Sequence, residues 1–431
     1  MRVGRFSAQK ELLSDDTSKG SINHSVFSSS CLIAGTTIGG GFLALPYTTR
    51  PLGFIPACLG LLLAWIYVTF SSLSLTKLIF HIKKQGENNE NTNNLSIFTI
   101  TKYFGGPKVS YLASLLFAVL MVTTLIAQFS KIGSLGVQAF GYRHVHKNIY
   151  ILLSAAIMRA LLSSSKKIID TINNLLSGVM FSSFGILTVF GFTNPSWSLA
   201  SLFRYQRYDL LLPSLARSPS AASTTFWAIP LFLQLLVYNE VIPVVSDRLS
   251  SQKNVNRSIY IGVAHSLTHS LIHSFIHCIG GVLPLLMCIL WTAVALGLTP
   301  PTASVVDPVN YLIQGNANTK VVSMAVTTLA FAAIQTTVIG SVLACTQFIT
   351  DIFPKIDPAG SKNLAIFIPA LIAMGPASLY YSMTHLAGAF PVILLWGFIP
   401  QYYAQQIAPT REGFVSLLAS VMMLACNIIR R

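Results

Sequence analysis

Residues 34–46 read Ala34-Gly35-Thr36-Thr37-Ile38-Gly39-Gly40-Gly41-Phe42-Leu43-Ala44-Leu45-Pro46 and lie inside the first apolar segment, residues 26–47. Each glycine lowers the stability of a helix by about 1 kcal/mol relative to alanine, so a helix that only crosses a bilayer gains nothing from this cluster. We therefore expect the helix to unwind here and to leave main-chain polar groups facing a ligand, under cover of protein or a water-filled cavity. An alternative is a small-residue packing face, because Gly35 and Gly39 have the Gly-x-x-x-Gly spacing.

The composition is that of a polytopic membrane protein. Of 431 residues, 53% are hydrophobic and 10% are charged, whereas soluble domains carry about 25% charged residues. A net charge of +15 would suggest nucleic acid in a soluble protein. Here it indicates lysine and arginine gathered in loops on one side of a lipid bilayer, and we expect no nucleic-acid partner. The six cysteines lie in or beside apolar segments, so we expect no disulfide framework, no metal and no cofactor.

Eleven membrane spans are predicted from the length and apolarity of the segments. They cover approximately residues 26–47, 54–80, 107–141, 149–164, 168–192, 225–246, 281–298, 320–350, 364–382, 385–403 and 413–429. A cytoplasmic tail, 1–25, precedes the first span, and a short amphipathic piece, 95–105, precedes the third. Most lysines and arginines fall in loops that are cytoplasmic if the N-terminus is cytoplasmic, which predicts an N-in and C-out orientation.

The sixth span contains a second break signal, Leu235-Leu236-Val237-Tyr238-Asn239-Glu240-Val241-Ile242-Pro243. Among the 13 acidic residues, Glu240 alone lies well inside a predicted span. An ionised acid at the bilayer centre costs at least about 2.5–3.5 kcal/mol, so such a residue faces a cavity or a partner and is a functional candidate. Pro243 removes a helical hydrogen bond nearby. The alternative is a protonated Glu240 that a neighbour satisfies, with a structural role.

The two interrupted spans each open a five-span half of the predicted transporter domain, residues 26–431. The halves are 26–192 and 224–403, with 413–429 as an extra helix. Inverted halves place a substrate between the two breaks, and half-helix N-termini attract an anion such as a carboxylate. We therefore predict an all-α membrane protein with eleven transmembrane helices, a five-plus-five inverted repeat and broken helices 1 and 6, which binds a small carboxylate-bearing solute.

Residues 35–46 resemble the first-span signature of the aromatic amino acid permeases, the tyrosine- and tryptophan-specific proton symporters of the amino acid–polyamine–organocation superfamily. Further matches lie at 238–243, at 166–170 before span 5 and at 257–259 before span 7. The resemblance covers spans 1 to 11. It implies a five-plus-five inverted repeat with an eleventh span, and import of aromatic amino acids together with protons.

The chain departs from the bacterial members in span 6. A Phe-Gly-Phe-His-Gly-Ser run is typical there, and Asn239 and Glu240 stand where His and Gly would. In this respect the chain is more similar to eukaryotic photosynthetic members, some of which are plastid proteins. We therefore expect Glu240, in place of a histidine, to take the coupling proton. The expected location is the plasma membrane or an organelle membrane such as that of a plastid.

The expected substrate site consists of the two breaks and one residue of span 3. Its members are Gly35, Thr36, Thr37, Gly39, Gly40, Gly41, Gln128, Tyr238 and Asn239. Gln128 is equally compatible with an interhelical hydrogen bond, because polar side chains commonly join helices within membranes. In span 8, Thr336 and Thr337 offer hydroxyl groups either for a ligand or for helix packing.

An unusual segment, 263–280, carries a histidine at every fourth position, from His265 to His277. Without it, residues 259–262 would join 281–285 and resemble the family's uninterrupted span 7. We interpret the segment as an insertion, such as a retained intron. The alternatives are a cytoplasmic amphipathic helix and a metal- or pH-sensing element.

These observations predict a secondary active transporter that imports an aromatic amino acid, tyrosine or tryptophan, by proton symport. The alternatives are transport of another neutral amino acid and a non-transporting sensor on the same fold. We expect no enzyme activity, because a catalytic pair within the membrane would need a second acid or a histidine beside Glu240 within a span.

Overall fold

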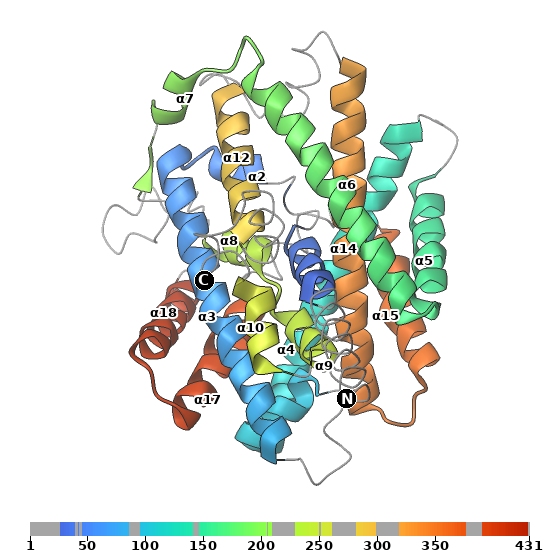
Figure 1. Cartoon of the computed structure of the whole chain (residues 1–431), viewed down its shortest axis with the longest axis vertical. Helices are drawn as coiled ribbons and strands as arrows, with labels where there is room; N and C mark the ends of the chain where they lie inside the picture. The colour runs from blue at the N-terminus through green and yellow to red at the C-terminus, as the bar shows by residue number, and fades with distance from the viewer. Residues whose placement is uncertain are drawn as a thin grey trace, which may run out of the picture.

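The computed structural model describes residues 26–38, 42, 45–85, 95–140, 146–204, 206–208, 229–249, 251–260, 282–298, 319–375 and 390–429. Within these ranges the chain is helical and contains no strand (Figure 1). The tail 1–25, the glycines Gly39, Gly40 and Gly41, and the histidine-rich segment 263–280 lie outside the described residues.

The first described helix is Val26–Thr37. The elements that follow it are α2 (Leu45–Thr49), α3 (Phe54–Gln85), α4 (Ile97–Phe140), α5 (Lys147–Ser163), α6 (Lys166–Phe192), α7 (Leu199–Phe203), α8 (Ile229–Leu236), the 3₁₀ turn η5 (Asn239–Val241), α9 (Ile242–Arg248), α10 (Gln252–Tyr260), α12 (Val282–Leu298), α14 (Thr319–Ile352), α15 (Pro358–Ala373), the π-helical η6 (Ile393–Phe398), α17 (Ile399–Ile407) and α18 (Arg411–Ile429).

Local sequence explains several helix ends. Asp357 accepts a hydrogen bond from the Gly360 backbone N–H at 3.1 Å and caps α15, whose first residue is Pro358. Both features satisfy or remove donors that a helix start leaves unpaired. Within α4, Gly106 has φ 73° and ψ −177°. This non-helical residue separates the first turns of α4 from the long part that begins at Pro107, as the sequence predicts.

Four described helices are long and apolar enough to cross a membrane: Phe54–Gln85, Ile97–Val137, Lys166–Phe192 and Lys320–Ile352. Shorter apolar helices are Val26–Thr37, Val282–Leu298 and Pro358–Ala373. The predicted number of eleven spans therefore stays a prediction.

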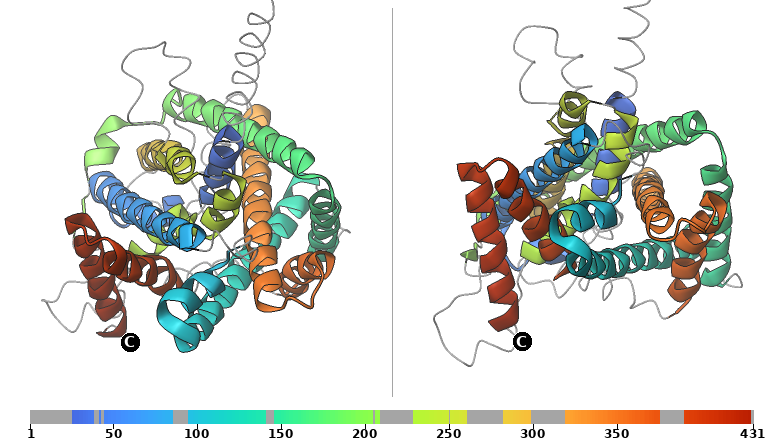
Figure 2. Two further views of the ribbon diagram at one scale, coloured as in Figure 1. Left: turned by 60° about the horizontal axis from the view of Figure 1, so that its bottom comes forward. Right: turned by 90° about the horizontal axis from the view of Figure 1, so that it is seen from below.

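Helix α14 lies at the centre of the helical assembly. In its most apolar stretch 83% of residues are buried, against 33% to 50% in the other three long helices. The helix Val26–Thr37, dark blue, runs beside α14, orange, in Figures 1 and 2. A single long helix thus contacts the segment in which the glycine-rich stretch begins.

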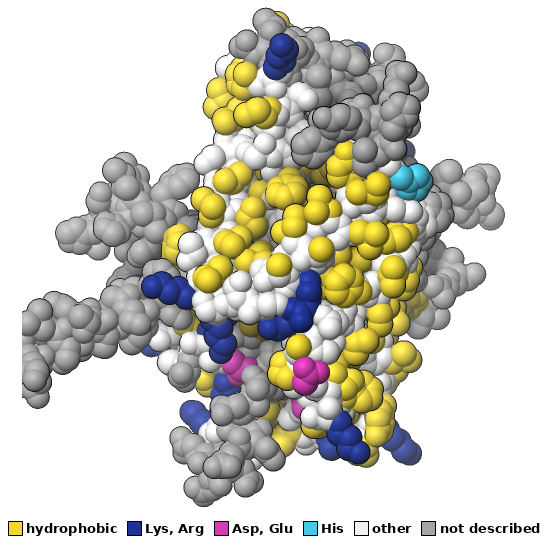
Figure 3. All heavy atoms as spheres, turned by 90° about the vertical axis from the view of Figure 1, so that its right-hand side faces the viewer, with side chains coloured by type: hydrophobic (Ala, Val, Ile, Leu, Met, Phe, Trp, Pro, Cys, Tyr) yellow, Lys and Arg dark blue, Asp and Glu magenta, His cyan; other side chains and the backbone are white. Residues whose placement is uncertain are grey.

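The outer surface suits a lipid environment. On the face drawn in Figure 3, hydrophobic side chains cover the middle and upper parts, while most of the charged side chains lie toward the lower end. Exposed apolar residues include Ile149 and Leu153 on α5 and Leu371 on α15. A broad apolar surface with charges gathered at one end is what a membrane-embedded helical protein requires.

Candidate functional site

The first helix ends inside the glycine-rich stretch. The Ile38 backbone N–H donates to the Ala34 carbonyl oxygen at 2.9 Å, the helix ends at Thr37, and the next helix begins at Leu45. Phe42, described between them, is buried against two other helices, with its ring 5.7 Å from that of Phe184 and 5.8 Å from that of Trp291.

Helix α14 supplies donors to the end of this first helix. The Thr336 and Thr337 hydroxyl oxygens lie 3.0 and 3.1 Å from the Gly35 carbonyl oxygen. A helix end leaves its last carbonyl groups without intrahelical partners, and a buried one must find partners elsewhere. The approach is close because Gly35 has no side chain: a Cβ atom there would lie 2.7 Å from Thr336 Cβ. Each of these hydroxyl groups also lies within hydrogen-bond distance of the Ala333 carbonyl oxygen in α14, so each shares its one proton between its own helix and the first break.

The second break is visible between α8 and α9. Helix α8 ends at Leu236, Tyr238 has φ −142° and ψ 11°, and a 3₁₀ turn over Asn239–Val241 leads into α9. Pro243 stands in the first turn of α9, where its missing N–H costs nothing. The helical interruption that the sequence predicts in span 6 is therefore present.

The Asn239 side chain ties this break to α3. Its Nδ2 donates to Ser71 Oγ at 2.7 Å, and its Oδ1 accepts from Ser72 Oγ at 2.8 Å. All three side chains are buried. Both ends of the amide are thus engaged by α3, and its predicted role in binding a substrate stays a prediction.

The two breaks meet at one residue of α14. A Cβ atom at Gly340 would lie 2.2 Å from Thr36 Oγ1 and 3.2 Å from Val241 Cγ1. Thr36 belongs to the first helix and Val241 to the 3₁₀ turn of the second break. The structure therefore brings residues of both interrupted segments against the same point, and the absence of a side chain at Gly340 permits it.

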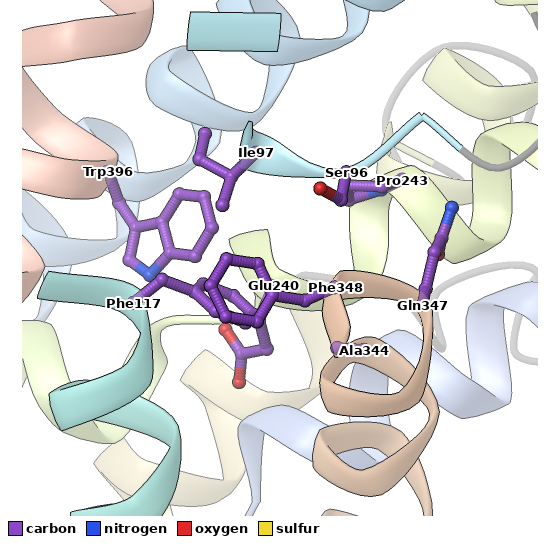
Figure 4. A pocket seen from close by; sticks show the side chains of 9 residues that line it. All are labelled: Ser96, Ile97, Phe117, Glu240, Pro243, Ala344, Gln347, Phe348 and Trp396. Atoms are coloured by element: carbon purple, nitrogen blue, oxygen red, sulfur yellow. The ribbon is translucent and has the colours of Figure 1, made fainter. Parts of the chain in front are cut away.

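Glu240 is buried beside a small cavity next to the second break. Its side chain is 5% exposed, and Oε2 has no hydrogen-bond partner among the described residues. Figure 4 shows the side chains around it. The cavity is lined by Ser96, Ile97, Phe117, Glu240, Pro243, Ala344, Gln347, Phe348 and Trp396. Its volume of about 10 Å³ holds about one water molecule, so it is too small for an amino acid in this conformation.

Aromatic rings form much of the cavity wall. The Phe117 ring centroid lies 4.5 Å from that of Phe348 and 6.0 Å from that of Trp396. The Trp396 indole N–H also has no hydrogen-bond partner among the described residues. The wall therefore combines apolar surface with one donor and one carboxyl oxygen that lack partners within the described part of the chain, the composition of a site for a small polar or protonated group.

The predicted site residues divide into groups. Gly35, Thr36 and Thr37 are buried at the first break, and Tyr238 and Asn239 at the second. The Thr36 and Thr37 hydroxyl groups donate to Leu32 and Ile33 in their own helix. Gln128 is buried in α4, the helix that contributes Phe117 to the cavity wall. Gly39, Gly40 and Gly41 lie outside the described residues.

Sequence reasoning missed the role of Gly340 and all the cavity residues except Glu240 and Pro243. A glycine within a long apolar span is a signal of close approach, so Gly340 was detectable. Phe117, Phe348 and Trp396 were not, because aromatic residues in apolar spans are ordinary core or lipid-facing residues.

The sequence matches a known protein family over residues 22–277 and 269–406, described as the tryptophan/tyrosine permease family. The two matched pieces overlap at residues 269–277, within the histidine-rich segment. A curated relative, the tyrosine-specific transport system 1 of Haemophilus influenzae, is 24% identical over 244 residues, which are 56% of this chain and 54% of the relative. The chain therefore spans about half the length of that relative.

Two solved structures share the fold. One is the Eremococcus coleocola manganese transporter in complex with an aromatic bis-isothiourea substituted compound, with 12% identity, a TM-score of 0.57 and coverage of 94% of this chain and 86% of that one. The other is a Na⁺-coupled sialic acid symporter in a substrate-bound outward-open state, with 11% identity, a TM-score of 0.57 and coverage of 94% and 88%.

At such low identity these likenesses show the fold alone. The family match covers most of the chain, and the long apolar helices make it an integral membrane protein. The two interrupted helices, the fold and the matched residues agree, and the chain belongs to the tryptophan/tyrosine permease family.

Proposed function

We propose that the chain is a secondary active transporter that moves an aromatic amino acid, tyrosine or tryptophan, across a membrane together with a proton. The observation that carries the proposal is the meeting of two interrupted helices at Gly340 of α14, with Glu240 beside one of them, whose Oε2 has no hydrogen-bond partner among the described residues. Family membership and the name of the Haemophilus relative support the substrate class.

The substrate would bind at the two breaks. Main-chain N–H groups of Gly39, Gly40 and Gly41 would receive its carboxylate, because half-helix N-termini carry partial positive charge. Main-chain groups at Gly35, Thr36 and Thr37, with Tyr238 and Asn239 opposite, would complete the site, and Gln128 would contact the amine or the ring substituent. An aromatic ring needs more room than the present cavity offers, so binding would accompany a movement that widens it.

Glu240 would carry the coupling proton. An ionised carboxylate is costly to bury when one oxygen lacks a hydrogen-bond partner, whereas the neutral acid carries no such charge penalty. A conformation that closes Glu240 away from water is therefore favoured when Glu240 is protonated. Protonation then biases which side of the protein is open, which is the differential stabilisation that coupling requires.

The wider architecture belongs to the same proposal. It comprises eleven spans, two inverted halves at 26–192 and 224–403, an N-in orientation, and residence in the plasma membrane or in an organelle membrane such as that of a plastid. Lys83 and Arg248 stand in the last turns of α3 and α9, which end toward the lower part of Figure 1. Basic residues at these ends favour a cytoplasmic position for them.

The test is uptake by the purified protein in proteoliposomes. Radiolabelled tyrosine, tryptophan and alanine are supplied with and without an inward proton gradient. We expect concentrative uptake of tyrosine or tryptophan that collapses with the gradient. Concentrative uptake of alanine alone would favour the second candidate, another neutral amino acid. The departure from the bacterial run at Asn239 and Glu240 is the reason to include this arm. Binding of tyrosine without any uptake would indicate a sensor and refute the proposal.

A further inference from the structure

Two neighbouring charged residues end the half-helix α9 and tie it to three other helices. Asp247 Oδ1 accepts from Lys83 Nζ of α3 at 2.9 Å, and its Oδ2 accepts from Gln347 Nε2 of α14 at 2.7 Å. Arg248 Nη1 donates to Asp170 Oδ1 of α6 at 2.6 Å. We call these contacts the α9 clasp.

The position of α9 depends on such contacts. The helix has seven residues, Ile242–Arg248, and the break at Val237 and Tyr238 interrupts the hydrogen-bond ladder that would otherwise join it to α8. A short helix beyond a break can turn about that break, because a few residues with changed backbone angles absorb the movement. The side-chain contacts at its far end then decide where it rests.

The clasp shares residues with the wall of the Glu240 cavity. Gln347 lines the cavity, and its Nε2 contacts both Asp247 and the Leu95 carbonyl oxygen, the latter at 3.1 Å. Ser96, the next residue, also lines the cavity, and its hydroxyl group donates to Asp351 of α14 at 2.5 Å. Pro243 brings α9 itself into the wall. In Figure 4, Ser96, Pro243 and Gln347 lie together on the right, away from Trp396.

The chemistry of the clasp suits a contact that opens and closes. The side chains of its two ion pairs are between 17% and 25% exposed. Partly exposed ion pairs contribute modest stability and are weaker than an apolar seal, so they can break and re-form in each cycle. Because Asp247 and Arg248 carry opposite charges, α9 binds basic or amide side chains on α3 and α14 and an acidic side chain on α6.

We propose that the α9 clasp closes the route from the lower end of the molecule to the Glu240 carboxyl group. Releasing Asp247 from Lys83 and Gln347, and Arg248 from Asp170, lets α9 swing about the break. This movement takes Pro243 out of the cavity wall and admits water to Glu240. The role of the clasp in transport, control of proton release from Glu240, rests on the proposed function. The closed position of α9 rests only on the hydrogen bonds and ion pairs of the clasp.

The test is a cysteine reporter in the cavity wall. Ala344 lines the cavity and is 4% exposed, so Ala344→Cys is placed in a background without the native cysteines, of which Cys345 is its neighbour. A membrane-impermeant maleimide is added to each face of the membrane separately. Arg248→Glu and Asp170→Arg each remove the ion pair between Arg248 of α9 and Asp170 of α6. Each should raise the labelling rate by about five-fold from the face at which α9 ends, the effect of a pair worth about 1 kcal/mol.

The double variant, in which the Asp170 and Arg248 charges are exchanged, should return labelling to the reference rate. Lys253→Glu is the matched control, because Lys253 is an exposed residue of α10 and its replacement changes the charge by the same amount; it should label at the reference rate. If Arg248→Glu does not fold, Arg248→Gln keeps the side-chain stem and removes the charge, with the same expectation.

Unchanged labelling in folded single variants, or a charge exchange that fails to restore closure, would overturn the proposal. The readout needs no substrate. A protein that shows the expected labelling but transports neither tyrosine nor tryptophan would therefore support the clasp and refute the proposed function. A protein that transports tyrosine or tryptophan but shows unchanged labelling in the variants would refute the clasp alone.

Discussion

Gly340→Ala is the substitution that most directly disturbs the meeting of the two breaks. The new methyl carbon would lie 2.2 Å from Thr36 Oγ1 and 3.2 Å from Val241 Cγ1. The Thr36 hydroxyl group cannot simply turn away, because it donates to the Leu32 carbonyl oxygen at 2.8 Å. Either this hydrogen bond breaks or α14 moves away from both breaks.

The magnitude follows from these two alternatives. Losing the hydrogen bond costs about 0.5–1.5 kcal/mol, and overpacking a well-packed core costs about 1–3 kcal/mol. Because alanine favours the helix more than glycine does, the substitution also stabilises α14 by up to about 1 kcal/mol. Against a glycine-to-alanine control with the same gain in helix propensity, overpacking therefore leaves a loss of about 1–3 kcal/mol in the free energy of unfolding, or roughly 1–3 °C in melting temperature for a chain of this size.

The assay is thermal unfolding of the purified protein in detergent. Gly178→Ala and Gly185→Ala in α6 are matched controls, because a Cβ atom at either position meets nothing within 4 Å. Both should unfold at or above the reference temperature. Adding Thr36→Ala to Gly340→Ala removes the closest contact and leaves the Thr36 Cβ atom at 3.3 Å, so the double variant should recover part of the loss. A Gly340→Ala protein as stable as the α6 controls would refute the reasoning.

Three further substitutions test individual contacts. Asn239→Ala leaves its two serine partners on α3 without the amide, which should lower the free energy of unfolding by about 1–3 kcal/mol in the same thermal assay; an unchanged melting temperature would contradict this role. Thr337→Val keeps the side-chain shape but removes a hydroxyl group near the Gly35 carbonyl oxygen, so hydrogen exchange should quicken in the helix Val26–Thr37, and unchanged exchange would count against it. Asp351→Asn weakens the carboxylate contact at the N-terminus of α4 by about 0.3–1 kcal/mol, with faster exchange confined to the first turns of α4 as the expected result; exchange equal to the parent protein would oppose it.

Features with a local cause could be predicted from the sequence. The first helix stops before a run of glycines, the α4 kink falls at Gly106, and the second break falls beside Glu240 and Pro243. Glycine, proline and a buried acid change helix stability at or near their own positions, whatever the rest of the chain does.

Contacts between distant segments could not be predicted. Thr336 and Gly35 are 301 residues apart, and Asn239 and Ser71 are 168 residues apart. From the sequence, the hydroxyl groups of Thr336 and Thr337 were compatible with either ligand binding or helix packing. In the structure they lie beside the Gly35 carbonyl oxygen, near the end of the first helix. The partner of a buried polar group depends on which helices pack together, and a single sequence does not encode that pairing locally.

The number of spans shows a limit of length-based reasoning. A span that is broken is divided into short helices such as α8, with eight residues, and α9, with seven. At about 1.5 Å per residue, neither reaches across a bilayer of about 30 Å. The interruptions at the proposed binding site therefore also remove spans from a count based on helix length.

Proton movement linked to substrate addition tests the central claim most directly. Proteoliposomes that contain a pH-sensitive dye receive external tyrosine or tryptophan without a preset gradient, and radiolabelled exchange is measured in parallel. We predict that the native protein acidifies the lumen as the amino acid enters. Glu240→Gln should bind and exchange the amino acid but leave the luminal pH unchanged. Acidification by Glu240→Gln at the native rate would contradict the assignment of the coupling proton to Glu240.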